Sequence, residues 1–376
     1  MKIIAISGSE IPSINANSIQ TMKAVHALAM LGHEVRLIVP MAPGQHHASV
    51  WKELAHFYGL TREFEIEFLP SASRRLFFFA ASRRAKKMKP DLVYVWPLQS
   101  AVMGLFMNLP VVLEMHDLPS GRIGPLWFRY FRDGKGKKRI AAVTKALQTE
   151  LEALYEDPKG TIDCVISPNA VELERFANLP DKTTARFQSG LKEATTVMCT
   201  GHLYAGRGVE LFLQLAKEFQ DQGVEFVWVG GNQAEIDTWK AKTDGLDNVT
   251  FTGFIPNNEL PLYQAAADVL LMPYGHHIGI SSGKGNSARI SSPMKMFEYL
   301  ASGRPILSSD LPVFREVLNE RNAIFCKPED LAEWKKALSA VLADPAKQQA
   351  LSAQALEDAK QYTWQERARR ILANFP

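Results

Sequence analysis

The sequence predicts an α/β protein made of two doubly wound domains, each built around a parallel sheet. Three observations support this prediction. Short apolar runs alternate with amphipathic helical patterns along almost the whole chain. One polar stretch without a strand, 171–194, interrupts the alternation, which then resumes. The length of 376 residues suits two domains, in which right-handed crossovers join parallel strands.

The first half of the chain contains the strands of one sheet. We expect strands at 2–7, 33–40, 92–97, 110–117, 141–144 and 163–170. A helix from Asn17 to Leu31 follows the first strand, and Gly32 is its expected stop. The segment 73–90 is basic and aromatic, with an apolar centre that is typical of an amphipathic helix.

The second half repeats the pattern. We expect strands at 195–203, 224–231, 248–255, 268–274 and 305–309, and helices at 208–222, 232–241 and 258–266. The last helices fall between Pro328 and Phe375. The expected division is therefore an N-terminal domain at 1–170, a linker at 171–185, a second domain at 186–355 and a C-terminal helix at 356–376 that returns to the first domain.

Composition narrows the class of protein. The chain is 46% hydrophobic and 22% charged, as in ordinary globular proteins, and its formal charge of +3 is too small to indicate nucleic-acid binding. Cys164, Cys199 and Cys326 are scattered, which favours buried thiols in a reducing compartment over disulfides or a zinc site. The apolar N-terminal run is too short for a secretory signal, and no window reaches the length of a membrane span. We expect a cytoplasmic protein that is at most peripheral to a membrane.

One segment, 287–318, predicts an anion site. Ser292 is the expected cap of a helix, Pro293 its first residue and Gly303 its end. The first turn then presents the backbone amides of residues 294–296, and Lys295 adds a positive charge.

Glu298 is unusual in this helix because its neighbours are apolar. A carboxylate in such surroundings needs a hydrogen-bond partner, and ribose hydroxyls would serve. The alternative is a glutamate that the helix dipole favours near the N-terminus.

The stretch "SSPMKMFEYLASGRPILSSDLPVFREVL" resembles the donor-binding segment of retaining glycosyltransferases of the GT-B fold, specifically glycosyltransferase family 4. Four further segments resemble the same family: "VISPNAVELERF", "TGHLYAGRGVELFLQLA", "FTGFIPNNELPLYQAAADVLLMPY" and "YTWQERARRIL". The resemblance covers most of residues 160–376. It implies two Rossmann-like domains facing a central cleft, with the acceptor bound by the first and a nucleotide-sugar donor by the second.

The resemblance also implies site residues. Its catalytic candidates are His116, Arg207 and Lys295. Its donor-binding candidates are Ser292, Met294, Met296, Glu298, Gly201, His202, Gly230 and Ile255. Its acceptor-side candidates are Ser13, Asn15, Asn17 and Asp117. Structural roles are the alternatives: a solvated loop arginine at 207, a hydrogen-bonded structural histidine at 116, and turn or cap residues at 13, 15 and 17.

Two positions depart from the family pattern. Ile290 stands where many members carry a glutamate that contacts the sugar, so the sugar contacts are open. His202 stands where arginine is common, which places more of the expected diphosphate binding on Arg207.

The resemblance implies a metal-independent transfer of a hexose-type sugar from a nucleotide-diphosphate sugar to an acceptor hydroxyl, with retention of the anomeric configuration. No cofactor or metal is expected, and no acidic pair of the DxD kind follows a strand. The family's front-face mechanism implies that the departing phosphate takes the acceptor's proton. The base stays open among UDP, GDP and ADP, with a UDP-sugar slightly favoured over a GDP-sugar.

The acceptor and three rival functions also stay open. The basic clusters at 73–90 and 129–140 suit an anionic membrane, a glycolipid or another lipid-linked or polysaccharide precursor; a small molecule is the alternative. The rivals are a GT-B nucleotide-sugar 2-epimerase, a dinucleotide-dependent dehydrogenase and a non-catalytic sugar-binding protein. The dehydrogenase would need a GxGxxG motif after the first strand, where "SGSEIPS" stands.

Overall fold

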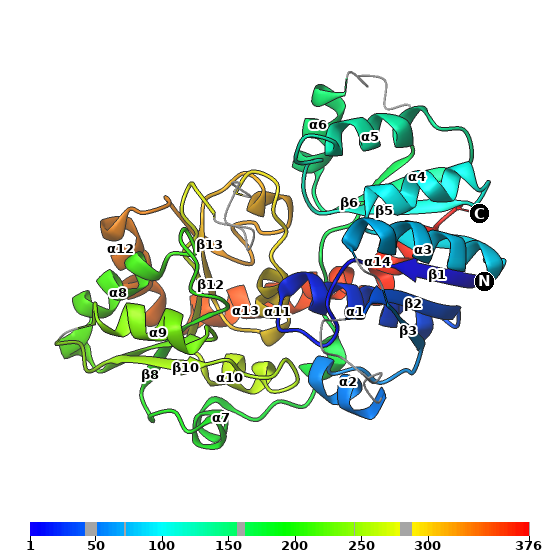
Figure 1. Ribbon diagram of the computed structural model, residues 1–376. Coiled ribbons are helices and arrows are strands. Elements are labelled where there is room, and N and C mark those ends of the chain that lie inside the picture. Colours follow the sequence, from blue (N-terminus) through cyan, green and yellow to red (C-terminus); the bar gives the residue numbers. More distant parts are fainter. Residues whose placement is uncertain (42–50, 71–72, 156–161, 244, 279–287, 376) are drawn as a thin grey trace. The chain divides into compact units, whose positions relative to one another are not determined.

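The structure is a computed structural model that describes residues 1–41, 51–70, 73–155, 162–243, 245–278 and 288–375. The chain forms two compact units (Figure 1). Unit 1 contains Met1–Asn169 and Trp364–Pro376, and unit 2 contains Ala170–Thr363. Each unit holds a fully parallel sheet flanked by helices, which confirms the predicted class of two doubly wound, Rossmann-like domains.

The segment 171–185, expected as a linker, lies within unit 2. Val171 pairs with Thr363 in an isolated parallel bridge, and its amide donates to the carbonyl of Tyr362 at 2.9 Å. Arg175 donates to the carbonyl of Asn257. The return to unit 1 begins at Trp364, several residues later than position 356.

Unit 1 has a seven-stranded parallel sheet. Its spatial order is β3 (Glu65–Leu69), β2 (Glu34–Pro40), β1 (Lys2–Ile6), β4 (Leu92–Val95), β5 (Val111–Met115), β6 (Lys138–Ala142) and β7 (Cys164–Ile166). The central strands β1, β4 and β5 are buried and mostly apolar, as is usual for parallel strands that are covered on both faces.

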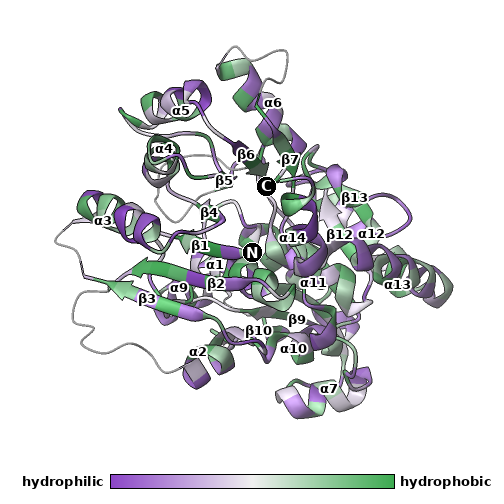
Figure 2. Ribbon diagram, turned by 90° about the vertical axis from the view of Figure 1, so that its right-hand side faces the viewer, coloured by the Kyte–Doolittle hydropathy of each residue, from purple (hydrophilic) through white to green (hydrophobic). Residues whose placement is uncertain are grey.

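In the described part of the chain, unit 1 has seven α-helices. They are α1 (Ala16–Met30), α2 (Trp51–Tyr58), α3 (Arg74–Lys87), α4 (Leu98–Phe106), α5 (Gly124–Asp133), α6 (Lys145–Leu154) and α14 (Trp364–Leu372). Right-handed crossovers place α3, α4 and α5 on one face of the sheet and α1 on the other, where α14 packs against it. The ribbons of α3 and α5 carry both hydrophilic and hydrophobic turns (Figure 2).

Unit 2 has a six-stranded parallel sheet. Its spatial order is β10 (Val249–Gly253), β9 (Val224–Val229), β8 (Thr195–Thr200), β11 (Val269–Met272), β12 (Ile306–Ser309) and β13 (Ile324–Cys326). Its helices are α7 (Lys182–Ser189), α8 (Val209–Glu218), α9 (Gln233–Lys240), α10 (Leu260–Ala266), α11 (Met294–Ser302), α12 (Leu331–Leu342) and α13 (Pro345–Ala359). The side chains of Phe212, Trp228 and Trp334 are fully buried in its core.

The three cysteines are buried or half-buried, as expected for an ordinary globular protein. Cys199 and Cys326 are buried and Cys164 is half-buried, and all three are free thiols. Burial raises the pKa of Cys164 and of Cys326 to about 12, so both are held in the unreactive thiol form. Across the described residues, no helix has the length and apolar character needed to cross a bilayer.

Candidate functional site

The strand order of unit 2 defines where a ligand would bind. From β8 the chain proceeds outward to β9 and β10, and from β11 it proceeds outward the other way to β12 and β13. The neighbouring strands β8 and β11 therefore flank the point at which the strand order reverses. In open parallel sheets, ligands bind at the carboxyl ends of the strands at such a point.

Two glycines shape the loop that follows β8. Gly206 has φ +76° and Gly208 has φ +84°, and these left-handed conformations favour glycine. A Cβ at Gly206 would lie 1.7 Å from the carbonyl oxygen of His277, and one at Gly208 would lie 1.8 Å from that of Pro273. The loop thus packs backbone against backbone on the segment after β11, and this packing fixes the position of Arg207 between the two glycines.

Arg207 and Lys295 meet at one aromatic ring, that of Tyr274, just beyond β11. The Nη1 atom of Arg207 donates to the Tyr274 hydroxyl at 2.9 Å, and its guanidinium lies 5.3 Å from the ring centroid. The Nζ atom of Lys295 lies 5.0 Å from the same centroid and 3.6 Å from the sulfur of Cys199. Lys295, the second residue of α11, and Arg207, in the loop after β8, are therefore brought together at the reversal point.

Neither cation forms an ion pair with a carboxylate in the described part of the chain. Lys295 is only 9% exposed, and the buried Nε atom of Arg207 has no hydrogen-bond partner there. The sequence of 279–287 contains no Asp or Glu. Buried charges without a partner are costly, so this arrangement is suited to an anionic ligand that neutralises both side chains.

The start of α11 differs from the expectation in one respect. Pro293 is the N-cap residue, with extended ψ of 130°, and its own side chain makes no cap hydrogen bond. The prediction that Ser292 caps it and that Pro293 is its first residue is therefore wrong, because Pro293 does not have helical ψ. Ser292 is buried just outside the helix. Gly303 ends the helix in a left-handed conformation, as predicted.

The first turn of α11 offers fewer amides than expected. The Met296 amide donates to the carbonyl of Pro293 at 3.1 Å. Helix geometry leaves the amides of Met294 and Lys295 as the donors directed outward from the N-terminus.

Glu298 and Ile290 are both buried. Glu298 is 9% exposed, and its Oε2 atom accepts from the Nε2 atom of Gln264 in α10 at 3.3 Å. The apolar neighbours of Glu298 in the sequence implied that its carboxylate has a hydrogen-bond partner. In the structure, Gln264 is such a partner. Ile290, whose side chain is apolar, is 3% exposed.

His202 follows β8 and stacks on Tyr204, with ring centroids 4.9 Å apart and nearly parallel planes. Burial lowers the pKa of His202, although Glu235 acts in the opposite direction. The ring is therefore neutral near pH 7 and adds no charge beside Arg207 and Lys295.

Three donor-binding candidates lie at neighbouring strand ends. The carbonyl of Gly201 accepts from the indole of Trp228 at 2.9 Å, and the position of a Cβ at Gly201 lies 3.4 Å from the Nζ of Lys295. Gly230, after β9, bridges to Gly253 at the end of β10. Ile255 is half-buried two residues further on.

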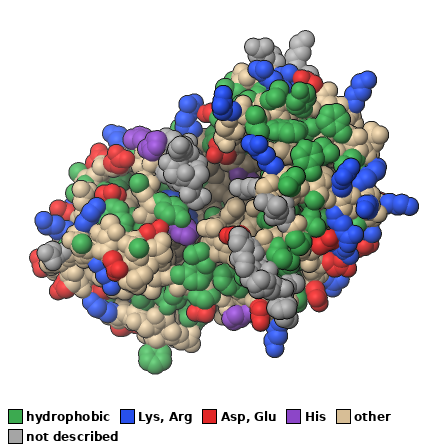
Figure 3. All heavy atoms as spheres, in the orientation of Figure 1, with side chains coloured by type: hydrophobic (Ala, Val, Ile, Leu, Met, Phe, Trp, Pro, Cys, Tyr) green, Lys and Arg blue, Asp and Glu red, His purple; other side chains and the backbone are tan. Residues whose placement is uncertain are grey.

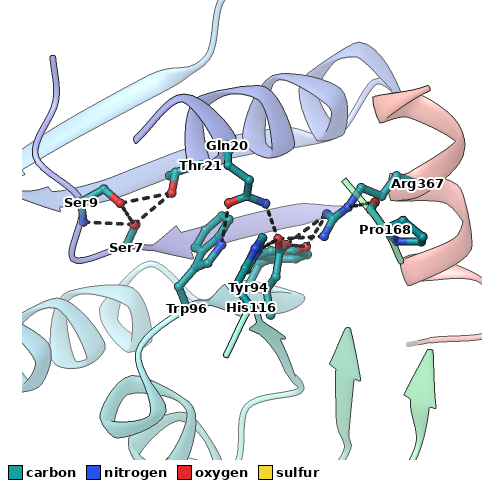
Figure 4. A network of polar contacts seen from close by, with 10 residues as sticks. Ser7, Ser9, Gln20, Thr21, Tyr94, Trp96, His116, Pro168 and Arg367 are labelled. Carbon is teal, nitrogen blue, oxygen red and sulfur yellow. Dashed lines mark hydrogen bonds and ion pairs between the residues drawn. The ribbon is translucent and has the colours of Figure 1, made fainter. Parts of the chain in front are cut away.

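In unit 1, Glu114 on β5 is the centre of a buried polar network. Figure 4 labels its partners Gln20, Tyr94, His116 and Arg367. The Glu114 carboxylate is 2% exposed. Arg367 donates to both of its oxygens, at 2.8 and 3.1 Å, and His116 Nε2 lies 2.6 Å from Oε1. The Tyr94 hydroxyl and the Gln20 amide also donate to it. Residues from β4, β5, α1 and α14 thus converge on one carboxylate.

This network fixes which ring nitrogen of His116 carries a hydrogen. Burial alone would raise the pKa of Glu114, but the Arg367 guanidinium and the hydrogen bond from His116 outweigh burial and hold that pKa well below its usual range. Because the carboxylate is ionised, the Nε2 atom of His116 carries a hydrogen. Nδ1 is therefore the ring nitrogen that remains for another partner, and the side chain is 32% exposed.

The remaining residues of the network hold its partners in place. The Trp96 indole donates to the Gln20 side-chain oxygen at 3.0 Å, which orients the Gln20 amide nitrogen toward Glu114. The Nε atom of Arg367 donates to the Pro168 carbonyl at 2.9 Å. The C-terminal helix α14 is thereby bonded to two segments of unit 1.

The acceptor-side candidates form hydrogen bonds with residues outside this network. Asn15 is the backbone N-cap of α1 without a side-chain cap bond, and its amide donates to the Ser13 hydroxyl at 3.2 Å. Asn17 donates to the Ser9 hydroxyl at 3.2 Å. Asp117 is exposed and accepts from the amide of Leu118. Bonds between residues close in sequence are common in turns, which is the alternative given above for Ser13, Asn15 and Asn17.

A hydroxyl cluster at the end of β1 was not predicted. Ser7, Ser9 and Thr21 lie within 3.0–3.4 Å of one another, and Ser7 is buried directly after the strand (Figure 4). Among the described residues, no three His, Cys, Asp or Glu side chains gather as a group that could hold a metal ion.

Comparisons with known proteins agree with this architecture. Residues 19–175 match the model of the "Glycosyltransferase Family 4", and residues 194–344 match that of the "Glycosyl transferases group 1". The chain belongs to this family of GT-B glycosyltransferases.

Curated relatives are glycosyltransferases of several kinds. A 2-deoxystreptamine glucosyltransferase of Streptomyces kanamyceticus is 26% identical over 215 residues, which is 55% of this chain and 52% of the relative. The O-antigen chain mannosyltransferase RfbU of Salmonella typhimurium is 32% identical over 235 residues, 60% of this chain and 59% of the relative. The chain thus spans about half the length of these relatives.

The fold is similar to that of solved glycosyltransferases. HepE of Anabaena, solved in complex with UDP and glucose, has a TM-score of 0.74 and 15% identity, with 100% of this chain and 99% of that chain covered. WaaG, a glycosyltransferase involved in lipopolysaccharide biosynthesis, has a TM-score of 0.67 and 17% identity, with 98% and 100% covered.

Proposed function

We propose that this chain is a retaining, metal-independent hexosyltransferase that uses a nucleotide-diphosphate sugar as donor. The observation that carries the proposal is the pair of cations, Arg207 and Lys295, which lie without a carboxylate partner among the described residues at the reversal point of the unit 2 sheet. A diphosphate has the charge and the size to engage both side chains together with the amides of Met294 and Lys295.

The same groups account for the chemistry. As the sugar–oxygen bond breaks, negative charge develops on the diphosphate, and Arg207 and Lys295 stabilise it without the help of a metal ion. The sugar passes through an oxocarbenium-like state. The acceptor hydroxyl attacks from the face that the diphosphate leaves, and the departing phosphate oxygen takes its proton.

His116 contacts the sugar in this proposal. Because Glu114 accepts from Nε2, the Nδ1 atom is the one that remains for a sugar hydroxyl. Glu298 binds the ribose, and Gly201, Gly230 and Ile255 border the nucleotide. The acceptor-side residues are Ser13, Asn15, Asn17 and Asp117.

The donor is a UDP-sugar in preference to a GDP-sugar. Structural neighbours solved in complex with UDP, UDP-glucose or UDP-2-fluoro glucose favour this choice. The acceptor is a hydroxyl of a glycolipid, a lipid-linked or polysaccharide precursor, or a small molecule. The protein works in the cytoplasm, in peripheral contact with the inner face of an anionic membrane.

Incubation of the protein with nucleotide sugars labelled in the sugar, in the presence of bacterial lipid and polysaccharide extracts, tests the proposal. We expect release of the nucleoside diphosphate and label in an acceptor whose new linkage has the donor's anomeric configuration by NMR. A chelator should not reduce the rate.

The other outcomes identify the rivals. Conversion of the donor to its 2-epimer would make the protein an epimerase. Binding of donor without any turnover would make it a sugar-nucleotide-binding protein. A product with the opposite anomeric configuration to the donor would agree with a glycosyltransferase but would contradict the retaining mechanism.

A further inference from the structure

Three neighbouring helices of unit 1 expose large apolar side chains. Leu76 and Phe79 of α3 are 58% and 43% exposed, and Phe106 at the end of α4 is 73% exposed. Leu126 and Tyr130 of α5 are 49% and 52% exposed. Exposed apolar side chains that occur together indicate an interaction surface, whereas single ones need no explanation.

These side chains lie on one side of the unit. Helix α4 packs against both α3 and α5, and all three cover the same face of the sheet. Figure 3 shows hydrophobic side chains gathered over α4 and α5, with Lys and Arg side chains beside them over α3. We call the outward side of these three helices the α3–α5 face.

The charge of the α3–α5 face is almost entirely positive. Helix α3 contains four arginines and two lysines and no acidic residue. The only acidic residue of α5 is Asp133, which pairs with Arg132 at 2.7 Å. Exposed basic residues are interleaved with the apolar ones: Arg75, Arg83, Lys87, Arg122 and Arg129.

The spacing on α3 places both kinds of side chain on one stripe. Leu76, Phe79, Arg83 and Lys87 follow one another at helical intervals of three or four residues. On α5, Leu126 and Tyr130 are four apart with Arg129 beside them. An apolar side chain next to a long basic one matches the boundary between acyl chains and anionic head groups.

We propose that the α3–α5 face docks on an anionic lipid bilayer. The apolar side chains enter the head-group region, and the basic ones contact the lipid phosphates. A second copy of this chain does not fit the face, because two equally basic surfaces repel each other. The inference specifies the membrane contact named in the proposed function, and it stands even if the chain transfers no sugar.

Vesicle co-sedimentation tests this docking directly. We expect the full chain to sediment with phosphatidylcholine vesicles that contain phosphatidylglycerol and to stay in solution with pure phosphatidylcholine. Added salt should weaken the binding, because exposed charges are screened. Reversal of three charges, in Arg75→Glu/Arg83→Glu/Lys87→Glu, should weaken it at least about tenfold.

Two matched variants control for general effects. Lys217→Glu/Lys240→Glu/Lys347→Glu makes the same change of charge at exposed lysines of unit 2 and should bind as the wild type does. Leu76→Ser/Phe79→Ser should lose binding, whereas Phe187→Ser, at a side chain of α7 that is 85% exposed, should retain it. Melting curves establish that each variant is folded.

Several results would overturn the proposal. One is equal sedimentation with neutral and anionic vesicles, or with neither. Another is an equal loss of binding in the two charge-reversal variants. A third is a dimer in light scattering that Leu76→Ser/Phe79→Ser dissociates, since the face would then join two copies of the chain.

Discussion

At the scale of single residues, we expect a small substitution at Glu114 to have a large effect on the free energy of unfolding. Glu114→Gln removes the negative charge that neutralises Arg367, which is 3% exposed. Breaking a buried ion pair from one side costs about 3–5 kcal/mol, because the other charge remains buried without its partner. We expect the free energy of unfolding, measured with urea, to fall by at least about 3 kcal/mol.

A matched variant isolates this effect. Glu366→Gln makes the same change at a half-exposed carboxylate that pairs with Arg369 on the surface of α14. Surface pairs contribute less than about 1 kcal/mol. If the two variants lose equal stability, or if Arg367→Met fails to recover part of the loss in Glu114→Gln, the ion pair does not stabilise unit 1 as described.

The same carboxylate predicts a pH dependence. The pKa of Glu114 in the folded chain lies below its ordinary value of 4.5, so the carboxylate stabilises the fold fully above pH 4.5. That contribution is lost as the pH falls from 4.5 toward the folded pKa. The stability difference between wild type and Glu114→Gln should therefore shrink between pH 6 and pH 3 in urea titrations. A constant difference would contradict the assignment.

The sequence alone could not identify this network. Glu114 stands in the otherwise apolar strand "VVLEM", and that context already required hydrogen-bond partners. Its partners Gln20, Tyr94 and Arg367 are far away in the sequence, and only the sheet order and the return of α14 bring them together. The cations Arg207 and Lys295 were predicted from local motifs, whereas their shared contact with Tyr274 follows from the fold.

At the scale of elements, the loop between β8 and α8 is the most constrained part of the candidate donor site. Gly206→Ala would place a Cβ 1.7 Å from the His277 carbonyl, so the backbone must move. We expect a loss of about 1–3 kcal/mol in stability beyond the cost of the left-handed conformation, and weaker nucleotide binding.

Gly223→Ala provides the control for backbone conformation. Gly223 has φ +66°, close to the +76° of Gly206, but no atom lies within 4 Å of its Cβ position. Denaturation curves of the two variants therefore separate the close approach from the φ strain. Equal losses would show that the contact with the His277 carbonyl is unimportant.

Most elements could be predicted from periodicity, and the exceptions have physical reasons. Each predicted strand overlaps an observed one, but 141–144 overlaps β6 at only two residues and 163–170 is longer than the three residues of β7. Strands β3 and β13 were not predicted. The observed helix ends differ from the predicted ones by a few residues, because the terminal turns of helices fray. Strand β3, "EIEFL", lies at the edge of the sheet and is polar on one side, and β13 has only three residues. The proline before α11 adopts an extended conformation, so the cap predicted from Ser-Pro was misplaced by one residue.

At the scale of the whole molecule, the two units differ in what they offer a ligand. In unit 1, the buried charges of Glu114 and Arg367 neutralise each other. Unit 2 leaves Arg207 and Lys295 without a carboxylate among the described residues. A nucleotide diphosphate should therefore stabilise the chain through unit 2, and hydrogen exchange should slow mainly at the carboxyl ends of its strands.

A thermal-shift comparison of wild type with Lys295→Met tests the central claim, that these two cations bind a nucleoside diphosphate. At about 100 times its Kd, the matching diphosphate among UDP, GDP and ADP should raise the wild-type Tm by about 3 °C or more. Lys295→Met should be at least as stable without ligand, because it removes an uncompensated buried charge, and should show no shift. Lys335→Met, at a surface lysine that pairs with Glu218, should respond as the wild type does. An absence of any shift in the wild type, or an equal shift in Lys295→Met, would contradict the account.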